Sequence, residues 1–283
     1  MKLQKILSKF QKLHSREIDL SLDRIRFLMS KLGNPQDKIK CIQVCGTNGK
    51  GSSISFLRSI LREANYKCNV YTSPHVISIN ERFIYNDEMI GDDDLANLLN
   101  EVHEVNNGKP LTYFEALTAG FFLGCMKYQD NIVLAEFGLF GRGDAVNILK
   151  RNLANCITSI SYDHVNWLPD NDRTIERIIY EKTSSLLNSN IIVAKQSSNK
   201  IVECIKKNIS NNSANKIFYK EDYNFVLKEN DFFLYEDKYD SLKIPKPSIK
   251  GDFQLENAST AIATLRTLKD LNIEDKHIIE GVK

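Results

Sequence analysis

The sequence predicts an α/β protein built on a doubly wound, mainly parallel sheet with a P-loop, a phosphate-binding turn. Short apolar runs alternate with amphipathic helical segments along most of the 283 residues, which is the pattern of a parallel sheet. A glycine-rich turn joins the first of these runs to a helix, as in many phosphate-binding folds. Between about 216 and 248 the pattern changes to short β segments separated by charged turns, which predicts a small antiparallel appendage.

The elements follow in order from the hydrophobic periodicity. An opening helix with apolar positions at Leu20, Ile25, Leu28 and Leu32 is expected to end at the Gly33-Asn34-Pro35 turn. The pattern then predicts strands at 41–45, 68–71, 132–135, 156–160 and 191–194 and a hairpin at 81–90. It predicts helices from the turn to about 64 and over 92–105, 112–128, 174–187, 200–208 and 254–270, with a last helix from about 274.

Composition excludes several classes of function. The formal net charge of +2 comes from nearly balanced acids and bases, so there is no electrostatic case for nucleic-acid or membrane binding. The N-terminus lacks the apolar core of a secretory signal, and the longest apolar stretch, near 116–126, is too short to span a bilayer. The six cysteines show no metal-ligand spacing, and three lie in apolar strand-like runs. A reduced, cytoplasmic environment is expected.

The glycine-rich turn at 46–52 is the most specific chemical signal. Its glycines let the backbone approach an anion, Lys50 can reach terminal phosphates, and a hydroxyl can bind magnesium. The spacing differs from a Walker A motif, because Gly51 separates Lys50 from Ser52. A turn that only connects strand to helix is the alternative, but we interpret it as a nucleoside-triphosphate site.

Three further polar motifs fall where predicted strands end. They are Ser73-Pro74-His75, the segment from Glu136 to Asp144, and Asp163-His164. Ligands of doubly wound sheets bind beyond the carboxyl ends of the strands, and serine, glutamate and histidine suit a divalent metal beside ATP. Plainer alternatives stay open: His75 could shape a turn, His164 could begin a surface turn or helix, and Glu115 could form a structural ion pair.

Together these motifs resemble folylpolyglutamate synthase/dihydrofolate synthase, which belongs to the Mur ligase superfamily of ATP-dependent amide-forming ligases. The resemblance rests on the run 46–52, Thr72-Ser73-Pro74-His75, Glu81-Arg82, Tyr113-Phe114-Glu115, Glu136 with Gly138, Gly141-Arg142, Asp163-His164 and Glu181-Lys182. It implies that ATP phosphorylates a pterin-linked carboxylate of dihydropteroate or a folate. The amine of L-glutamate then attacks the acyl phosphate, with ADP and phosphate as by-products.

The resemblance also implies roles for individual residues. ATP would be held by Gly46, Thr47, Asn48, Gly49, Lys50, Gly51 and Ser52, with Gln254 and Asn257 near the base and ribose. Magnesium would be held by Ser52, Ser73, Glu136 and His164, and by Lys182 once carbamylated, a modification that needs an amine unprotonated part of the time. The substrate contacts would be His75, Phe114, Arg142 and Asp144. Lys50, Lys182 and His164 would be the catalytic groups.

Several positions depart from the family pattern. Phe140 and Val146 replace the usual glycine and threonine of the pterin loop, and Val165, Phe253 and the run 183–185 also differ from the usual residues. These ligases carry a further C-terminal domain, which we expect to be absent from a chain that forms one ATP-binding domain over 1–283. We therefore expect a monomeric ligase or, as the alternative, a truncated, non-catalytic remnant that retains nucleotide or pterin binding. A phosphotransferase or GTPase is disfavoured by the loop spacing and by the lack of an N-K-x-D motif.

Overall fold

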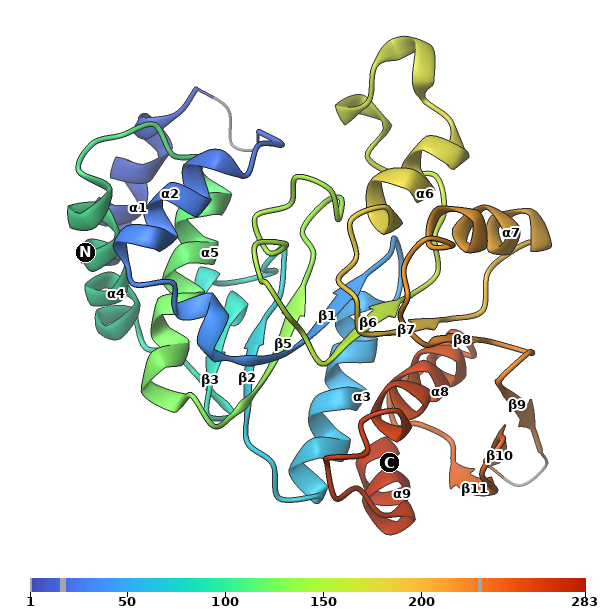
Figure 1. Cartoon of the computed structure of the whole chain (residues 1–283). Helices are drawn as coiled ribbons and strands as arrows, with labels where there is room; N and C mark the ends of the chain where they lie inside the picture. Colours follow the sequence, from blue (N-terminus) through green and yellow to red (C-terminus); the bar gives the residue numbers. More distant parts are fainter. Residues whose placement is uncertain (1, 16–18, 229–230) are drawn as a thin grey trace. The chain divides into compact units, whose positions relative to one another are not determined.

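The computed structural model describes residues 2–15, 19–228 and 231–283, and its contacts group into two compact units (Figure 1). The first unit comprises residues 1–40 and 68–150, and the second comprises 41–67 and 151–283. Each unit contains parallel strands with helices in the connections, so the predicted α/β class with mainly parallel strand pairing is confirmed.

Among its described residues, the first unit contains four strands and four α-helices. In sheet order the strands are β4 (Glu88–Met89), β3 (Phe83–Tyr85), β2 (Cys68–Tyr71) and β5 (Ile132–Glu136). Strands β2 and β5 are parallel, and the hairpin predicted at 81–90 adds β3 and β4 in antiparallel pairing. The helices are α1 (Lys2–Leu13), α2 (Asp23–Lys31), α4 (Asp92–Asn106) and α5 (Tyr113–Gly124). Helix α5 is buried on most faces, and its Phe121 stacks on Tyr71 with ring centroids 4.8 Å apart.

The second unit carries four parallel strands. In sheet order they are β1 (Lys40–Cys45), β6 (Ala154–Ile157), β7 (Asn190–Val193) and β8 (Lys216–Phe218). The helices are α3 (Lys50–Glu63), α6 (Ile175–Thr183), α7 (Asn199–Asn208), α8 (Phe253–Arg266) and α9 (Asp275–Val282). Helices α3 and α9 approach closely, because a Cβ added at Gly281 would lie 2.5 Å from the Cα of Ile60. A side chain at position 281 would push these helices apart.

The predicted antiparallel appendage is present as a three-stranded sheet. It consists of β9 (Tyr223–Leu227), β10 (Phe232–Asp237) and β11 (Ser241–Pro245), with β10 in the middle. Alternate side chains of β10 and β11, including Phe233, Tyr235 and Ile244, are buried, as expected for a sheet with one covered face. The antiparallel sheet begins at Tyr223 rather than near 216, because β8 pairs in parallel with β7.

Some predicted boundaries were wrong. Helix α1 was not predicted, although Leu3, Ile6, Leu7 and Phe10 follow helical spacing and are buried. The opening helix begins at Asp23, so Leu20 lies outside it. The strand predicted to reach 160 ends at Ile157, since the following residues bend to hydrogen-bond the glycine-rich turn. No helix in the described part of the chain combines the length and apolar character needed to cross a membrane.

Candidate active site

Two glycines shape the predicted phosphate loop of the second unit. Gly46 and Gly49 have φ angles of +138° and +88°, which side-chain-bearing residues rarely adopt. A Cβ at Gly46 would lie 2.0 Å from Thr158 Oγ1, and one at Gly49 would lie 2.2 Å from Asn257 Oδ1. Helix α3 begins directly after Gly49 without a side-chain cap, so its first N–H groups can bind an anion.

The first half of the loop is anchored to the protein itself. The N–H groups of Thr47 and Asn48 both donate to the carbonyl of Ser159, at 2.8 and 3.1 Å. The Thr47 hydroxyl donates to the carbonyl of Ser161 and accepts from its N–H. These bonds fix the loop, and they leave the N–H groups at the start of α3 available to an anion.

Two lysines converge on one carbonyl of the loop. Lys50 Nζ donates to the Thr47 carbonyl at 3.1 Å and to the Gly46 carbonyl at 3.4 Å. Lys182, from α6, donates to the same Gly46 carbonyl at 2.8 Å, although it is far away in the sequence. Lys182 is 1% exposed, so it is a buried lysine at the loop and not a solvated side chain of the helix surface.

His164 lies close enough to Lys50 and Lys182 to be influenced by their charges. It follows β6 in a turn with φ +57°, its N–H donates to Asp163 Oδ1 at 2.8 Å, and its Nε2 lies 3.2 Å from Asp163 Oδ2. Burial lowers the pKa of His164, Asp163 opposes the change, and the charges of Lys182 and Lys50 lower it further. The lowered pKa favours the neutral imidazole, which is the form that binds metal ions.

Gln254 and Asn257 lie at the start of α8, beside the loop. Both are buried, and Asn257 Nδ2 donates to Gln254 Oε1 at 2.9 Å. The close approach of Asn257 Oδ1 to Gly49 joins α8 to the phosphate loop. The predicted nucleotide-binding residues of the second unit thus lie together around the loop.

Ser73 and Glu136 lie together in the first unit. The Ser73 N–H donates to Glu136 Oε2 at 2.9 Å, and the Ser73 hydroxyl oxygen is buried with no hydrogen-bond partner among the described residues. A hydroxyl and a carboxylate are oxygen ligands of the kind that magnesium prefers, so the pair fits a metal. No three His, Cys, Asp or Glu side chains of the described residues gather into a metal site by themselves.

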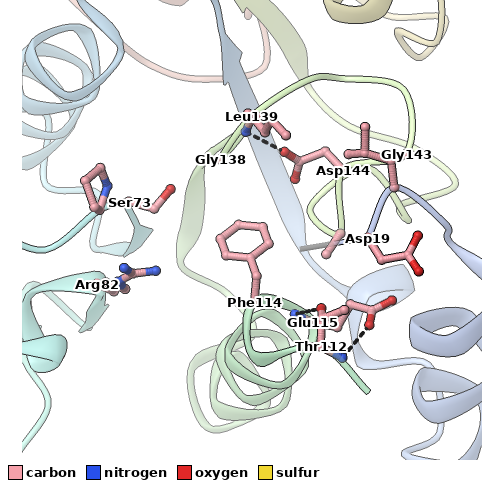
Figure 2. Close-up of a pocket in the computed structure, with 13 residues that line it drawn as sticks. Asp19, Ser73, Arg82, Thr112, Phe114, Glu115, Gly138, Leu139, Gly143 and Asp144 are labelled. Atoms are coloured by element: carbon pink, nitrogen blue, oxygen red, sulfur yellow. Dashed lines mark hydrogen bonds between the residues drawn. The ribbon is translucent and has the colours of Figure 1, made fainter. Parts of the chain in front are cut away.

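A cavity of about 150 Å³ lies in the first unit (Figure 2). Its lining consists of Asp19, Leu20, Ser73, Pro74, Arg82, Thr112, Phe114, Glu115, Gly138, Leu139, Gly143, Asp144 and Ala145. The Phe114 ring lies against Gly138, where an added Cβ would be 2.6 Å from the ring. The cavity is mostly apolar and includes the half-buried Phe114 ring, so it suits a planar ring.

The four predicted substrate contacts lie in different places. Phe114 and Asp144 line the cavity, but the Asp144 carboxylate accepts the N–H groups of Leu139 and Val146 at 2.9 and 3.0 Å and so braces its own loop. His75 lines a neighbouring cavity of about 560 Å³ and accepts a hydrogen bond from Arg82 Nε at 2.9 Å. Burial and then Arg82 lower the pKa of His75, against the opposing charge of Glu81. Arg142 is exposed and lines neither cavity.

Comparison with known proteins identifies the family. The Mur ligase middle domain matches residues 44–265 of this chain. The chain belongs to the Mur ligase family. The matched residues include the glycine-rich loop at 46–52 and the strands from β2 to β11.

Relatives within this family confirm the resemblance seen in the sequence. Dihydrofolate synthase/folylpolyglutamate synthase of Bacillus subtilis is 32% identical over 268 residues, which is 89% of this chain and 60% of that protein. The structure of Escherichia coli FolC in complex with DHPP and ADP is 30% identical, with a TM-score of 0.87, and the match covers 99% of this chain and 65% of that one. The bifunctional enzyme of Yersinia pestis complexed with AMPPNP and Mn ion is 26% identical, with a TM-score of 0.86 and the same coverages. The chain spans 60 to 65% of the length of these relatives.

The sequence analysis missed two residues at the cavity of the first unit. Asp19 lines it, and Arg24 lies behind it, donating to Glu115 Oε2 at 3.1 Å and to Asp19 Oδ2 at 3.3 Å. Glu115 therefore does form the ion pair that the sequence left open. Asp19 lies in a segment without periodicity, so no local pattern pointed to it.

Proposed function

We propose that this chain is an ATP-dependent amide ligase that joins L-glutamate to dihydropteroate, to folates, or to both. The γ-phosphoryl group of ATP passes to the substrate carboxylate, which gives an acyl phosphate and ADP. The amine of L-glutamate attacks the acyl carbon, loses a proton and expels phosphate. The names of the relatives and the nucleotide, metal and folate ligands named for related structures support this proposal.

The single observation that carries the proposal is the pair of lysines at the Gly46 carbonyl. Lys50 and Lys182 bring two amine nitrogens to one carbonyl, next to the uncapped start of α3. A triphosphate would accept hydrogen bonds from Lys50 and from the helix N–H groups. The charge of Lys50 would also stabilise the phosphoryl group during transfer, because its position needs no reorganisation.

We propose Mg²⁺ as the metal, with Ser73 and Glu136 among its ligands. The buried Ser73 hydroxyl without a partner and the adjacent carboxylate support this choice. When bound, the metal would neutralise charge on the phosphates. Ser52, His164 and a carbamylated Lys182 remain predicted ligands, and burial of Lys182 supports the modification because burial favours the uncharged amine.

The pterin ring is proposed to lie on Phe114 in the cavity of the first unit. Its mostly apolar lining and its size suit one planar bicyclic ring. A monomer acting in the cytoplasm remains part of the proposal. The free thiols of Cys41, Cys156 and Cys204 support a reducing compartment.

Binding calorimetry with ATP and magnesium tests the nucleotide site. Lys50→Ala should weaken ATP binding by at least ~10-fold, because it removes a charge-assisted contact to phosphate. Lys207→Ala, which removes an exposed lysine from α7 of the same unit, is the matched control and should bind ATP normally. Equal ATP affinity in the Lys50→Ala and Lys207→Ala variants would refute the loop assignment. Saturable binding of dihydropteroate, measured separately, tests the pterin site.

A further inference from the structure

The charged groups of the first unit's cavity are sorted to opposite sides of the Phe114 ring. Figure 2 shows Asp19, Glu115 and Asp144 on one side and Arg82 with Ser73 on the other. Dipolar lining of this kind fixes the direction of a ligand that has a donor-rich end and an anionic end.

Arg24 holds two carboxylates together at the acidic end. Its Nε donates to Glu115 Oε2 at 3.1 Å, its Nη1 donates to Asp19 Oδ2 at 3.3 Å, and its Nη2 donates to the Asp19 carbonyl at 3.1 Å. Arg24 thus pairs with two carboxylates, and His14 Nε2 also lies 3.6 Å from Asp19 Oδ2. Without the guanidinium, the two carboxylates would repel each other.

Glu115 keeps acceptor capacity for a ligand. The side chain is 2% exposed, and its Oε2 already accepts from Arg24 and, at 2.8 Å, from the N–H of Thr112. Its Oε1 is buried and has no hydrogen-bond partner among the described residues. A buried acceptor without a partner is costly, and a ligand N–H at this oxygen would remove the cost. Asp144 is different, because each of its oxygens already accepts a backbone N–H of its own loop.

The position of Asp19 is also fixed from the other side. Gly143 has φ +81°, and a Cβ added there would lie 3.1 Å from both the Cβ and the carbonyl oxygen of Leu20. The segment containing Asp19 and Leu20 therefore packs on the backbone of the loop at Gly143. Arg24 and Gly143 together place the Asp19 carboxylate at the cavity wall.

The opposite end of the cavity can take an anion. Arg82 uses only its Nε, toward His75, and the described residues place no carboxylate in ion-pair contact with its guanidinium. Ser73, one of the proposed metal ligands, lies on the same side in Figure 2. The carboxylate that the proposed reaction activates would therefore point toward Arg82 and Ser73.

We propose that Arg24 is a positioning residue that sets the direction and selectivity of pterin binding, an inference that rests on the proposed function. It holds Asp19 and Glu115 so that they accept from the amino-bearing edge of the heterocycle, while the anionic tail lies at Arg82. The cavity then selects a 2-amino pyrimidine edge over one that carries an oxygen at the same place.

Two fluorescent probes test the inference by equilibrium titration. They are pteroate and its 2-deamino-2-oxo analogue, which carries an oxygen in place of the amino group. The unsubstituted chain should bind pteroate at least ~10-fold more tightly, since the oxygen would face carboxylate acceptors. Arg24→Gln should bring the ratio of the two affinities close to one. Arg26→Gln, on the exposed face of the same helix, is the control and should keep the ratio.

Glu115→Gln distinguishes recognition from structural damage. The glutamine oxygen can still accept from Thr112, and its amino group would then face the ligand. The preference should therefore invert toward the oxo analogue, which loss of folding alone cannot produce. A ratio that persists in Arg24→Gln, or no inversion in Glu115→Gln, would overturn the inference. Equal binding of both probes by the unsubstituted chain would overturn it while leaving the proposed function intact, whereas binding of neither would overturn the proposed pterin site as well.

Discussion

Replacing Gly49 by alanine tests the geometry of the phosphate loop. An L-residue at φ +88° costs about 1–2 kcal/mol, because its Cβ crowds the following carbonyl. The same Cβ would lie 2.2 Å from Asn257 Oδ1, so Asn257 would have to move and lose its hydrogen bond to Gln254. That loss adds about 1 kcal/mol. We expect the free energy of unfolding to fall by about 2–3 kcal/mol in total.

Gly51→Ala is the matched control, two residues away. A Cβ at Gly51 meets no atom within 4 Å, and the residue lies in the first turn of α3, where alanine is favoured over glycine. Its stability should be unchanged or raised by up to about 1 kcal/mol. Urea unfolding of both variants, followed by circular dichroism, measures the difference. If Gly49→Ala is as stable as Gly51→Ala, the loop does not have this conformation and Asn257 does not contact it.

Three further predictions concern the buried Lys182, the Ser73 hydroxyl and the Glu81 carboxylate. Lys182→Met should weaken ATP binding by at least ~10-fold in calorimetry, because it removes a nitrogen that contacts the phosphate loop; unchanged affinity would separate Lys182 from the nucleotide site. Ser73→Ala should change the free energy of unfolding in urea by no more than about 0.5 kcal/mol, since the Ser73 hydroxyl has no partner among the described residues. A larger loss would mean that the hydroxyl supports the fold. The pKa of Glu81 lies below its usual 4.5, because the N–H groups of Val76, Ser78 and Ile77 bond its carboxylate. A lowered folded-state pKa gives stability that is present above about pH 4.5 and lost as the pH falls through the folded value. The stability difference between the unsubstituted chain and Glu81→Gln should therefore shrink on acidification, and a difference independent of pH would contradict the assignment.

Elements with strong local signals could be predicted from the sequence. The strand over 41–45 and the turn at Gly46 and Gly49 combine an apolar run with glycines that the backbone requires, and both are present in the structure. Strand ends were less certain, because the end of β6 depends on hydrogen bonds from Thr47 and Asn48, far away in the sequence. No window of local sequence contains that information.

For Lys182, the spacing along the helix and the residue type lead to opposite predictions about burial. It lies three and four residues after Ile179 and Ile178, on the buried stripe of α6, so helical spacing alone places it on the apolar face. The general preference of lysine for solvent favours the opposite interpretation. Its carbonyl partner at Gly46 supplies a polar contact inside the protein, and only the tertiary fold brings these two residues together.

The two acidic residues of the cavity, Asp144 and Glu115, show why motif membership does not decide a residue's role. Asp144 belongs to the loop motif and was predicted to contact substrate, and each of its oxygens also accepts a backbone N–H group of its own loop. Glu115 was left open between an ion pair and a substrate contact, and the two alternatives are compatible, because Oε2 pairs with Arg24 while Oε1 has no partner among the described residues. The sequence shows which residue carries a carboxylate, but not which hydrogen bonds each of its two oxygens accepts. Selectivity in this cavity therefore depends on Arg24, a residue that no motif includes, because it determines which oxygens are left for a ligand.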